Sequence, residues 1–158
     1  MREILFRGKQ SDTGEWVEGF LLKVTIDGKS AYLIFGDNFC FDGSDVKALS
    51  HALVDPATVG QFTGLVDKHG KRIFEGDIIT FGNGLTWVVG FELNAFVAMD
   101  EDNQVQFALF EQYKWKPNKA NPCAPEPIAP NHVEIIGNIH DNQELLEGGD
   151  TDGKERTE

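Results

Sequence analysis

Short hydrophobic runs separated by turn residues recur along the first third of the chain. Residues 4–7 and 32–35 are such runs, and a longer one from Trp16 to Ile26 ends at the turn pair Asp27-Gly28. Runs of this length between turn residues are typical of antiparallel strands joined by hairpins. The pattern therefore predicts a mainly β protein with a hairpin-built N-terminal lobe.

The stretch 44–55 has a different pattern, because it lacks Gly and Pro and its apolar residues are three and four positions apart: Val46, Leu49 and Leu53. This spacing is helical, and Ser44 or Asp45 is available as an N-cap. The residue before Pro56 is biased away from helical angles. We therefore predict at most one short helix in the N-terminal lobe, ending by Val54.

Turn signals continue in the second half of the chain. Residues 67–70 end in a glycine, Asn83-Gly84 is a strong hairpin signal, and Val105, Phe107 and Leu109 alternate with other residues at period two. The pattern predicts a meander of about four strands. We expect a further strand at 132–139 to close residues 59–110 into one small barrel.

The expected core of this barrel consists of large apolar side chains on its strands: Ile78, Trp87, Val89, Phe91, Phe107 and Ile136. Truncating a buried isoleucine to alanine typically costs about 2–5 kcal/mol. The sequence therefore predicts a loss of this size for Ile136→Ala.

Composition changes along the chain and sets the expected domain limits. The segment 117–130 is rich in proline, which cannot donate to a strand ladder, so we expect a loop there. The last residues are acidic and contain no aromatic side chain, which favours disorder. We predict an N-terminal β lobe at 1–55, a barrel lobe at 56–146 and a disordered acidic tail at 147–158.

The charge of the chain limits its partners. Its 158 residues carry 14 Lys and Arg against 26 Asp and Glu, a net charge of -12. Such an excess opposes general affinity for nucleic acids and for anionic membranes. No run of about 20 apolar residues is present, and the chain opens on a strand-like segment. We expect a cytoplasmic protein without a membrane partner.

Two separated segments of the chain form a recognisable signature. The first is 54–78, VDPATVGQFTGLVDKHGKRIFEGDI, and the second is 133–139, VEIIGNI, followed by DNQELL at 141–146. Together they resemble the signature of the YopX family of phage and prophage proteins. The opening strand at 4–7 is also similar to the family's. The chain departs from the family pattern at Gly8-Lys9, where many members carry an aromatic residue, and in the proline-rich segment.

The resemblance implies a β-rich fold with a C-terminal SH3-like barrel and a prophage setting in a bacterial cytoplasm. It implies no catalytic residue, cofactor or ligand. Within the matched segments, glycines stand where turns, crossings or bulges need a missing Cβ, and Asp77 follows a turn that its carboxylate can cap. We therefore interpret these motif residues as structural: Gly60, Gly64, Gly70, Gly76, Asp77, Gly137 and Asn138.

Candidate catalytic or metal-binding groups are scattered through the chain. His132 and His140 with Asp141 would suit a metal only if they shared a face, and Cys40 with His51 would need the fold to join them. The acid pairs Glu75/Asp77 and Asp100/Asp102 fall at turns, where carboxylates are usually solvated. We expect no metal, no cofactor and no enzymatic activity.

A basic, aromatic patch stands out on the acidic chain: Tyr113, Lys114, Trp115, Lys116 and Lys119. Small barrels hold single strands by stacking bases on aromatic rings beside cations, so this patch supports an alternative as a nucleic-acid-binding module. The leading hypothesis is a non-enzymatic phage or prophage accessory protein that binds a protein partner or associates with itself. A hydrolase with an unrecognised site is a third, weaker alternative.

Overall fold

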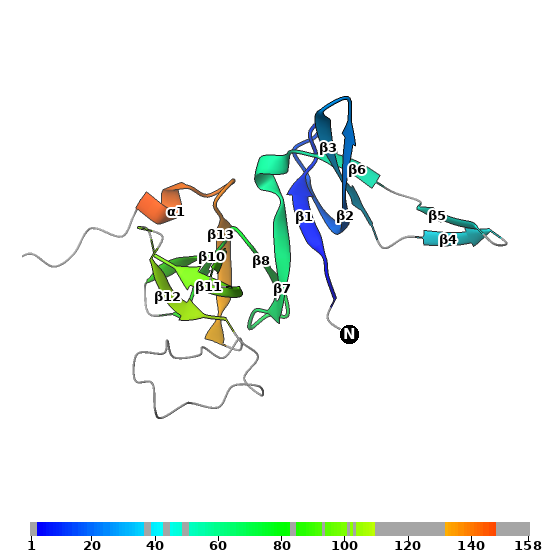
Figure 1. The fold of residues 1–158 in the computed structure, drawn as a ribbon. Coiled ribbons are helices and arrows are strands. Elements are labelled where there is room, and N and C mark those ends of the chain that lie inside the picture. The colour runs from blue at the N-terminus through cyan, green and yellow to red at the C-terminus, as the bar shows by residue number, and fades with distance from the viewer. Residues whose placement is uncertain are drawn as a thin grey trace, which may run out of the picture. The chain divides into compact units, whose positions relative to one another are not determined.

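A computed structural model describes most of the chain (Figure 1). The described residues are 3–36, 39–42, 45–48, 51–82, 85–92, 94–100, 102, 104–109 and 132–147, with the side chains of 39–42, 45–48, 106–108 and 147 left out. The chain divides into two compact units, residues 1–64 and 65–158. Strands dominate both units, which confirms the expected mainly β class.

The first unit consists of hairpins. Its strands are β1 (Phe6–Lys9), β2 (Trp16–Ile26), β3 (Lys29–Phe35), β4 (Phe39–Asp42), β5 (Asp45–Ala48), β6 (His51–Val54) and the first part of β7 (Gly60–Val66). The hydrogen-bonded order is β6-β3-β2-β1-β7, and β4 and β5 pair separately. Asp27 and Gly28 both have positive φ, as the tight turn between β2 and β3 requires.

The sheet of the first unit curls back on itself. Early in β2, Gly19 lies so close to β3 that a Cβ built on it would be 1.9 Å from the carbonyl oxygen of Phe35. At the other side of the sheet, Asp55 N donates to Lys9 O and Ser11 N donates to Leu53 O, each at 2.9 Å. These bonds join the end of β1 to the end of β6 and leave the sheet with an inner and an outer face.

The sequence allowed at most one short helix in the first unit, and the structure does not place it within 44–55. Asp45–Ala48 and His51–Val54 are strands, paired with β4 and β3 respectively. The apolar spacing fits a helix locally, but pairing with β3 and β4 outweighs this local propensity. The helical element of this unit is instead a 3-10 turn at Pro56–Thr58, capped by the Asp55 carboxylate, which accepts from Ala57 N at 3.0 Å.

The second unit contains the predicted meander. After the end of β7 come β8 (Arg72–Phe74), β9 (Asp77–Thr80), β10 (Thr86–Glu92), β11 (Ala95–Met99), β12 (Val105–Ala108), β13 (Glu134–Asn138) and the helix α1 (Glu144–Glu147). Strands β9 to β12 are consecutive antiparallel neighbours, as expected. Thr80 pairs with Thr86 across the β9–β10 connection, although Asn83-Gly84 itself lies outside the described residues.

The expected closure of these strands into a barrel is not found. Strand β13 pairs with β9, which gives the open order β12-β11-β10-β9-β13 in the part of the chain that the structure describes. The turn after β7 occupies the other side of β13, because Lys68 N donates to Val133 O at 2.9 Å and Ile135 N to Asp67 Oδ2 at 3.4 Å. Strand pattern alone does not specify the tilt and stagger that closure needs.

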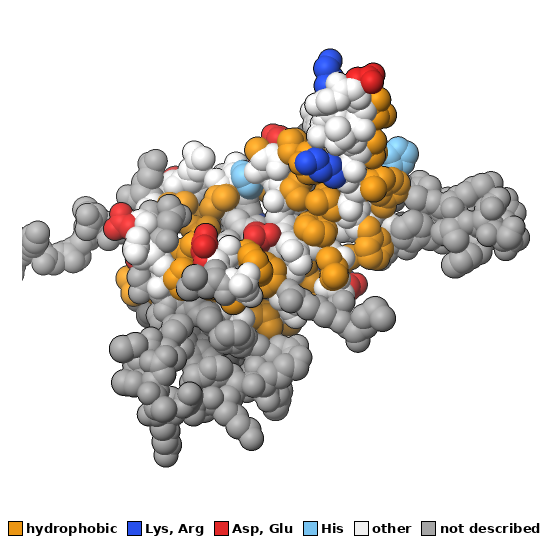
Figure 2. Space-filling view, in the orientation of Figure 1, with side chains coloured by type: hydrophobic (Ala, Val, Ile, Leu, Met, Phe, Trp, Pro, Cys, Tyr) orange, Lys and Arg blue, Asp and Glu red, His pale blue; other side chains and the backbone are white. Residues whose placement is uncertain are grey.

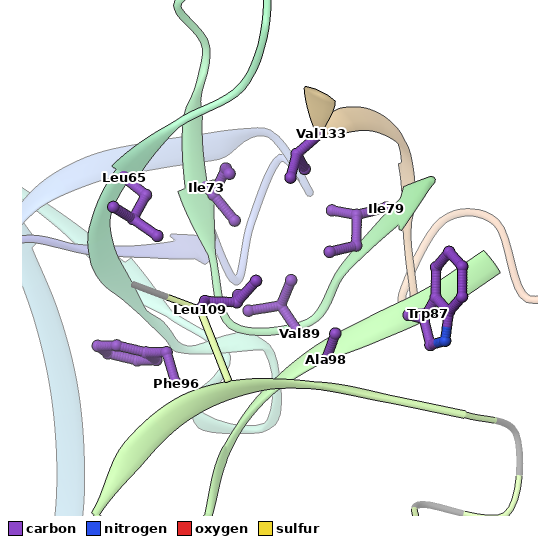
Figure 3. Close-up of a cluster of buried hydrophobic side chains, with 9 residues drawn as sticks. All are labelled: Leu65, Ile73, Ile79, Trp87, Val89, Phe96, Ala98, Leu109 and Val133. Carbon is purple, nitrogen blue, oxygen red and sulfur yellow. The ribbon is translucent and has the colours of Figure 1, made fainter. Parts of the chain in front are cut away.

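Among the described residues of the second unit, nine buried hydrophobic side chains form a core cluster, shown in Figure 3: Leu65, Ile73, Ile79, Trp87, Val89, Phe96, Ala98, Leu109 and Val133. Trp87 and Val89 were expected here, and Ile78 is also fully buried. The cluster draws on β7 to β11 and on the residues beside β12 and β13.

The sequence prediction was wrong for Ile136 and Phe91, which are 38% and 49% exposed. The pairing of β13 with β9 shifts register between Ile135 and Gly137, so Ile136 is the extra residue of a bulge and leaves the inward alternation. Phe91 lies at the end of β10 and packs edge-on against Phe96, with ring centroids 5.1 Å apart. The side chain of Phe107 lies outside the described residues.

Two expected segments, the proline-rich loop at 117–130 and the acidic tail at 147–158, also lie outside the described residues, apart from the backbone of Glu147. The lobe boundary predicted after Asp55 stays a prediction; the two compact units of the structure divide between residues 64 and 65. Within the described ranges, no helix has the length and apolar character needed to span a membrane.

Candidate functional site

The outer face of the first unit carries two rows of apolar side chains across β2, β3 and β6. Residues directly opposite in a ladder point to the same side of a sheet. Leu22 pairs with Leu33, which pairs with Leu53, and the next row is Phe20, Phe35 and His51. The Phe35 and His51 rings stack with centroids 5.6 Å apart, which shows directly that these side chains share a face.

We define the outer face by these two rows together with the apolar residues that continue β2: Phe20, Leu22, Val24, Ile26, Leu33, Phe35, His51 and Leu53. The exposed fractions are high for its large apolar members, at 47% for Phe20, 47% for Leu22, 66% for Ile26 and 52% for Leu53. Figure 2 shows hydrophobic side chains gathered over the strands of this unit.

The inner face of the same strands already has its packing partners. Ile34 and Val54 are 1% and 2% exposed. A Cβ added to Gly8 of β1 would lie 3.2 Å from Val54 Cβ and 3.3 Å from Ile34 Cδ1, so β1 approaches this face closely because Gly8 has no side chain. The unit's own core is therefore on the inner side, and the outer apolar rows do not contribute to it.

Charge is confined to the margin of the outer face. Lys29 pairs with Ile26 beside the turn, and His51 occupies the β6 edge. Neither row contains an acidic residue, although the whole chain has a net charge of -12. The arrangement suits contact with another apolar surface, and it offers no set of groups for acid-base or nucleophilic chemistry.

The two family-like motifs meet in the second unit. Asn138 of β13 pairs with Asp77 of β9, and Gly76 N donates to Val89 O at 2.8 Å while Gly76 O accepts from Ile139 N at 2.9 Å. Asp77 is 1% exposed, and its carboxylate accepts from Phe74 N at 2.8 Å, which caps the turn between β8 and β9. These residues join three strands of the second unit.

The remaining motif glycines occupy backbone positions that a side chain would disturb. Gly64, Gly70 and Gly76 have φ of 88°, 82° and 79°, which glycine adopts without a Cβ penalty. Gly60 is buried opposite Arg7. A Cβ on Gly137 would lie 2.8 Å from both Asn142 Oδ1 and Leu145 Cδ1. The missing side chain therefore lets α1 and the turn before it pack directly against β13.

A charged cluster surrounds the turn between β7 and β8. The buried Asp67 Oδ1 accepts from His69 N at 2.8 Å and Lys71 N at 2.9 Å. Burial opposes ionisation of Asp67, but these backbone donors outweigh it and hold the pKa below its ordinary value of 3.8.

A hydrogen bond from Lys68 Nζ lowers the pKa of Glu134 on β13, and His69 Nε2 lies 3.6 Å from Glu134 Oε1.

Asp67→Asn is expected to destabilise the protein at neutral pH, with a difference from wild type that shrinks in acid. Because the pKa is lower in the folded state, ionised Asp67 stabilises the fold above about pH 4, and this contribution is lost as pH falls through the folded pKa. Urea unfolding at pH 7, 5 and 3 measures the effect, with the exposed Asp102→Asn as control. A destabilisation that is independent of pH would contradict this role.

The structure does not bring the other candidate catalytic and metal-binding residues together into a site within the described ranges. No group of three His, Cys, Asp or Glu side chains with metal-binding geometry occurs among the described residues, so His132, His140 and Asp141 do not form one. Asp100 Oδ1 accepts from Asp102 N at 3.1 Å and Gln104 N at 2.8 Å, as a turn carboxylate does. The Cys40 side chain and the basic patch, Tyr113, Lys114, Trp115, Lys116 and Lys119, lie outside the described residues.

Sequence reasoning missed the outer face, although a signal for it exists. Residues 20–22 and 31–35 are apolar at both parities of a strand, whereas a sheet with one solvated face alternates. Continuous apolar strands indicate a sheet that is covered on both sides. Ladder register was needed to show that the apolar residues of three strands combine on one exposed face.

Comparisons with known proteins agree with this architecture. The family model described as YopX protein matches residues 5–147. A crystal structure of protein EF1440 from Enterococcus faecalis is similar, with a TM-score of 0.55 and 23% identity, over 92% of this chain and 99% of that one; this likeness shows the fold alone. No curated protein matches the chain. Because the family model covers nearly the whole sequence, the chain belongs to the YopX family.

Proposed function

We propose that this protein is a non-enzymatic accessory protein, encoded by a phage or prophage, that works in the bacterial cytoplasm by binding a protein partner or associating with itself. The outer face of the first unit is the observation that carries the binding role. Contiguous exposed apolar surface commonly marks a protein interaction site. The prophage setting and the compartment rest on the family resemblance.

The geometry of the outer face favours recognition over catalysis. The large apolar side chains of this face are between 47% and 66% exposed: Phe20, Leu22, Ile26 and Leu53. They lie on a sheet in which β3 is paired on both sides, with β2 and with β6. A preformed apolar surface on a rigid element loses little conformational entropy on binding. The acids of the second unit serve turns, so the proposal assigns them no catalytic role.

Affinity capture from a bacterial host lysate tests the proposal. We expect immobilised full-length wild type to retain protein, either a host or phage protein or further copies of itself, and the Leu22→Lys/Leu53→Lys double variant to lose it. Val105→Lys is the matched control, because Val105 is a 37% exposed aliphatic residue of the second unit. Equal retention by all three proteins would overturn the assignment to the outer face.

The nucleic-acid alternative is a second arm of the same experiment. Its candidate patch, Tyr113 to Lys119, lies outside the described residues. Retention of RNA or DNA that Trp115→Ala/Lys116→Glu abolishes, with no protein lost from the outer-face variant, would replace the proposal by that alternative.

A further inference from the structure

We propose that the second unit binds a buried water molecule where the two family motifs meet, between the side-chain amide of Asn138 and the carboxyl group of Asp77. Both residues are almost fully buried, at 7% and 1% exposed. They are directly opposite each other in the β9–β13 ladder, so their side chains share one face of the sheet. The inference is independent of the proposed function, which concerns the first unit.

The amide nitrogen of Asn138 requires an acceptor. Its Nδ2 atom is buried and has no hydrogen-bond partner in the part of the chain that the structure describes. The other end of the amide fixes its orientation, because Asn138 Oδ1 accepts from His140 N at 2.9 Å. A flipped amide would place two donors against each other. Buried donors are rarely left unsatisfied, because burial removes the water that they bind in the unfolded chain.

Each of the two side chains is held by a turn of its own. Asp77 Oδ2 accepts from Phe74 N at 2.8 Å in the turn before β9, and Asn138 Oδ1 serves the turn after β13. A carboxyl group offers up to about four acceptor sites, so the bond from Phe74 does not exhaust it. A molecule that joins the two groups must accept from the amide and donate to the carboxyl oxygen. Water does both, whereas a metal ion accepts no hydrogen bond and an anion would lie beside an acid.

Gly76 provides the space for this water. A Cβ added to Gly76 would lie 3.5 Å from Asn138 Nδ2 and 3.4 Å from the nearest side-chain atoms of Ile139. These are ordinary contact distances, so a methyl group fits at this position without displacing a neighbour, and a water molecule is smaller than a methyl group. The backbone N–H and C=O of Gly76 are already bonded to Val89 and Ile139, so side chains are the partners of the water.

Buried water is a common way to satisfy such groups. Globular proteins contain about one buried water per 27 residues, and each typically makes about three hydrogen bonds to polar groups that otherwise lack partners. A chain of 158 residues is therefore expected to hold several. Water at this position links β13 to β9 through side chains in addition to the ladder. Asn138 supplies the donor for it, and Gly76 supplies the space.

Nuclear magnetic resonance of the full chain labelled with ¹⁵N tests the proposal. We expect the side-chain NH₂ protons of Asn138 to show nuclear Overhauser effects to water, with the sign that distinguishes bound from bulk water. Exchange of amide protons with solvent rises steeply with pH, so an effect that is equal at pH 6 and pH 7 is a direct contact.

Two glycine variants test the position of the water. Gly76→Ala places a methyl group there and is expected to abolish the effect. Gly70→Ala is the matched control: its φ of 82° is close to the 79° of Gly76, so the backbone strain is similar, but nothing lies within 4 Å of its added Cβ. We expect Gly70→Ala to keep the effect. The backbone amide spectrum of each variant shows whether it folds.

The wild type alone can overturn the proposal. If its Asn138 amide shows no effect of the expected sign, no water is bound there, and this result does not depend on any variant folding. An effect that persists at full strength in folded Gly76→Ala also overturns the proposal, because the methyl group occupies the assigned position. Loss of the effect in folded Gly70→Ala would likewise count against it, since the added Cβ of that variant contacts nothing.

Discussion

Ile79→Ala is expected to lower the free energy of unfolding by about 2–5 kcal/mol, whereas Ile136→Ala should change it by only about 0.5 kcal/mol. Ile79 is fully buried and lies opposite both Trp87 of β10 and Ile135 of β13, so its truncation leaves a cavity inside the second unit's core. Ile136 projects from the bulge and is 38% exposed. Urea denaturation of the three proteins measures both effects.

This pair of isoleucines is a matched test because the two residues have the same side chain and lie on adjacent strands of one sheet. Equal losses at both positions would mean that Ile136 points inward and that the register shift between Ile135 and Gly137 is absent. A small loss at Ile79 would contradict the core in Figure 3.

Gly19→Ala is expected to destabilise the first unit by about 3 kcal/mol, because the new Cβ would lie 1.9 Å from the carbonyl oxygen of Phe35 and 2.6 Å from its carbon. The obstacle is backbone of the neighbouring strand, which cannot rotate away as a side chain can. Relief requires β2 and β3 to separate at the aromatic row of the outer face.

Gly28→Ala is the control for this prediction. Its φ of 76° also disfavours alanine, but nothing lies within 4 Å of the added Cβ, so only the local cost of about 1–2 kcal/mol remains. Thermal unfolding followed by calorimetry compares the two variants. If Gly28→Ala were as costly as Gly19→Ala, the close crossing at Gly19 would not be what distinguishes this residue.

Local residue chemistry was enough to predict most elements of the fold. The run from Trp16 to Ile26 is a strand over its full length, and the turns at Asp27-Gly28 and 67–70 are present. Turns can be predicted from sequence because Asp and Gly have specific backbone and hydrogen-bonding preferences that act within a few residues. The YopX family was predicted from two separated motifs, and the family model confirms it.

The predictions that failed depend on contacts between residues distant in the chain. The helical spacing of 44–55 was overridden mainly by the pairing of β6 with the distant strand β3, while β5 pairs with its neighbour β4. Ile136 was turned outward by a bulge that arises only when β13 pairs with β9. The expected barrel does not close, and the side of β13 that faces away from β9 is bonded to the turn after β7: Asp67 accepts from Ile135 N, and Lys68 N donates to Val133 O.

The sequence by itself determined the β class, most strands and turns, and the family, because hydrophobic period and turn chemistry act over a few neighbouring residues. Only the tertiary structure decided which apolar residues are core and which form the outer face. Leu22, Leu33 and Leu53 come from three strands, and their alignment depends on register, which is a property of paired strands. A surface built across strands therefore becomes visible only when the strands are placed together.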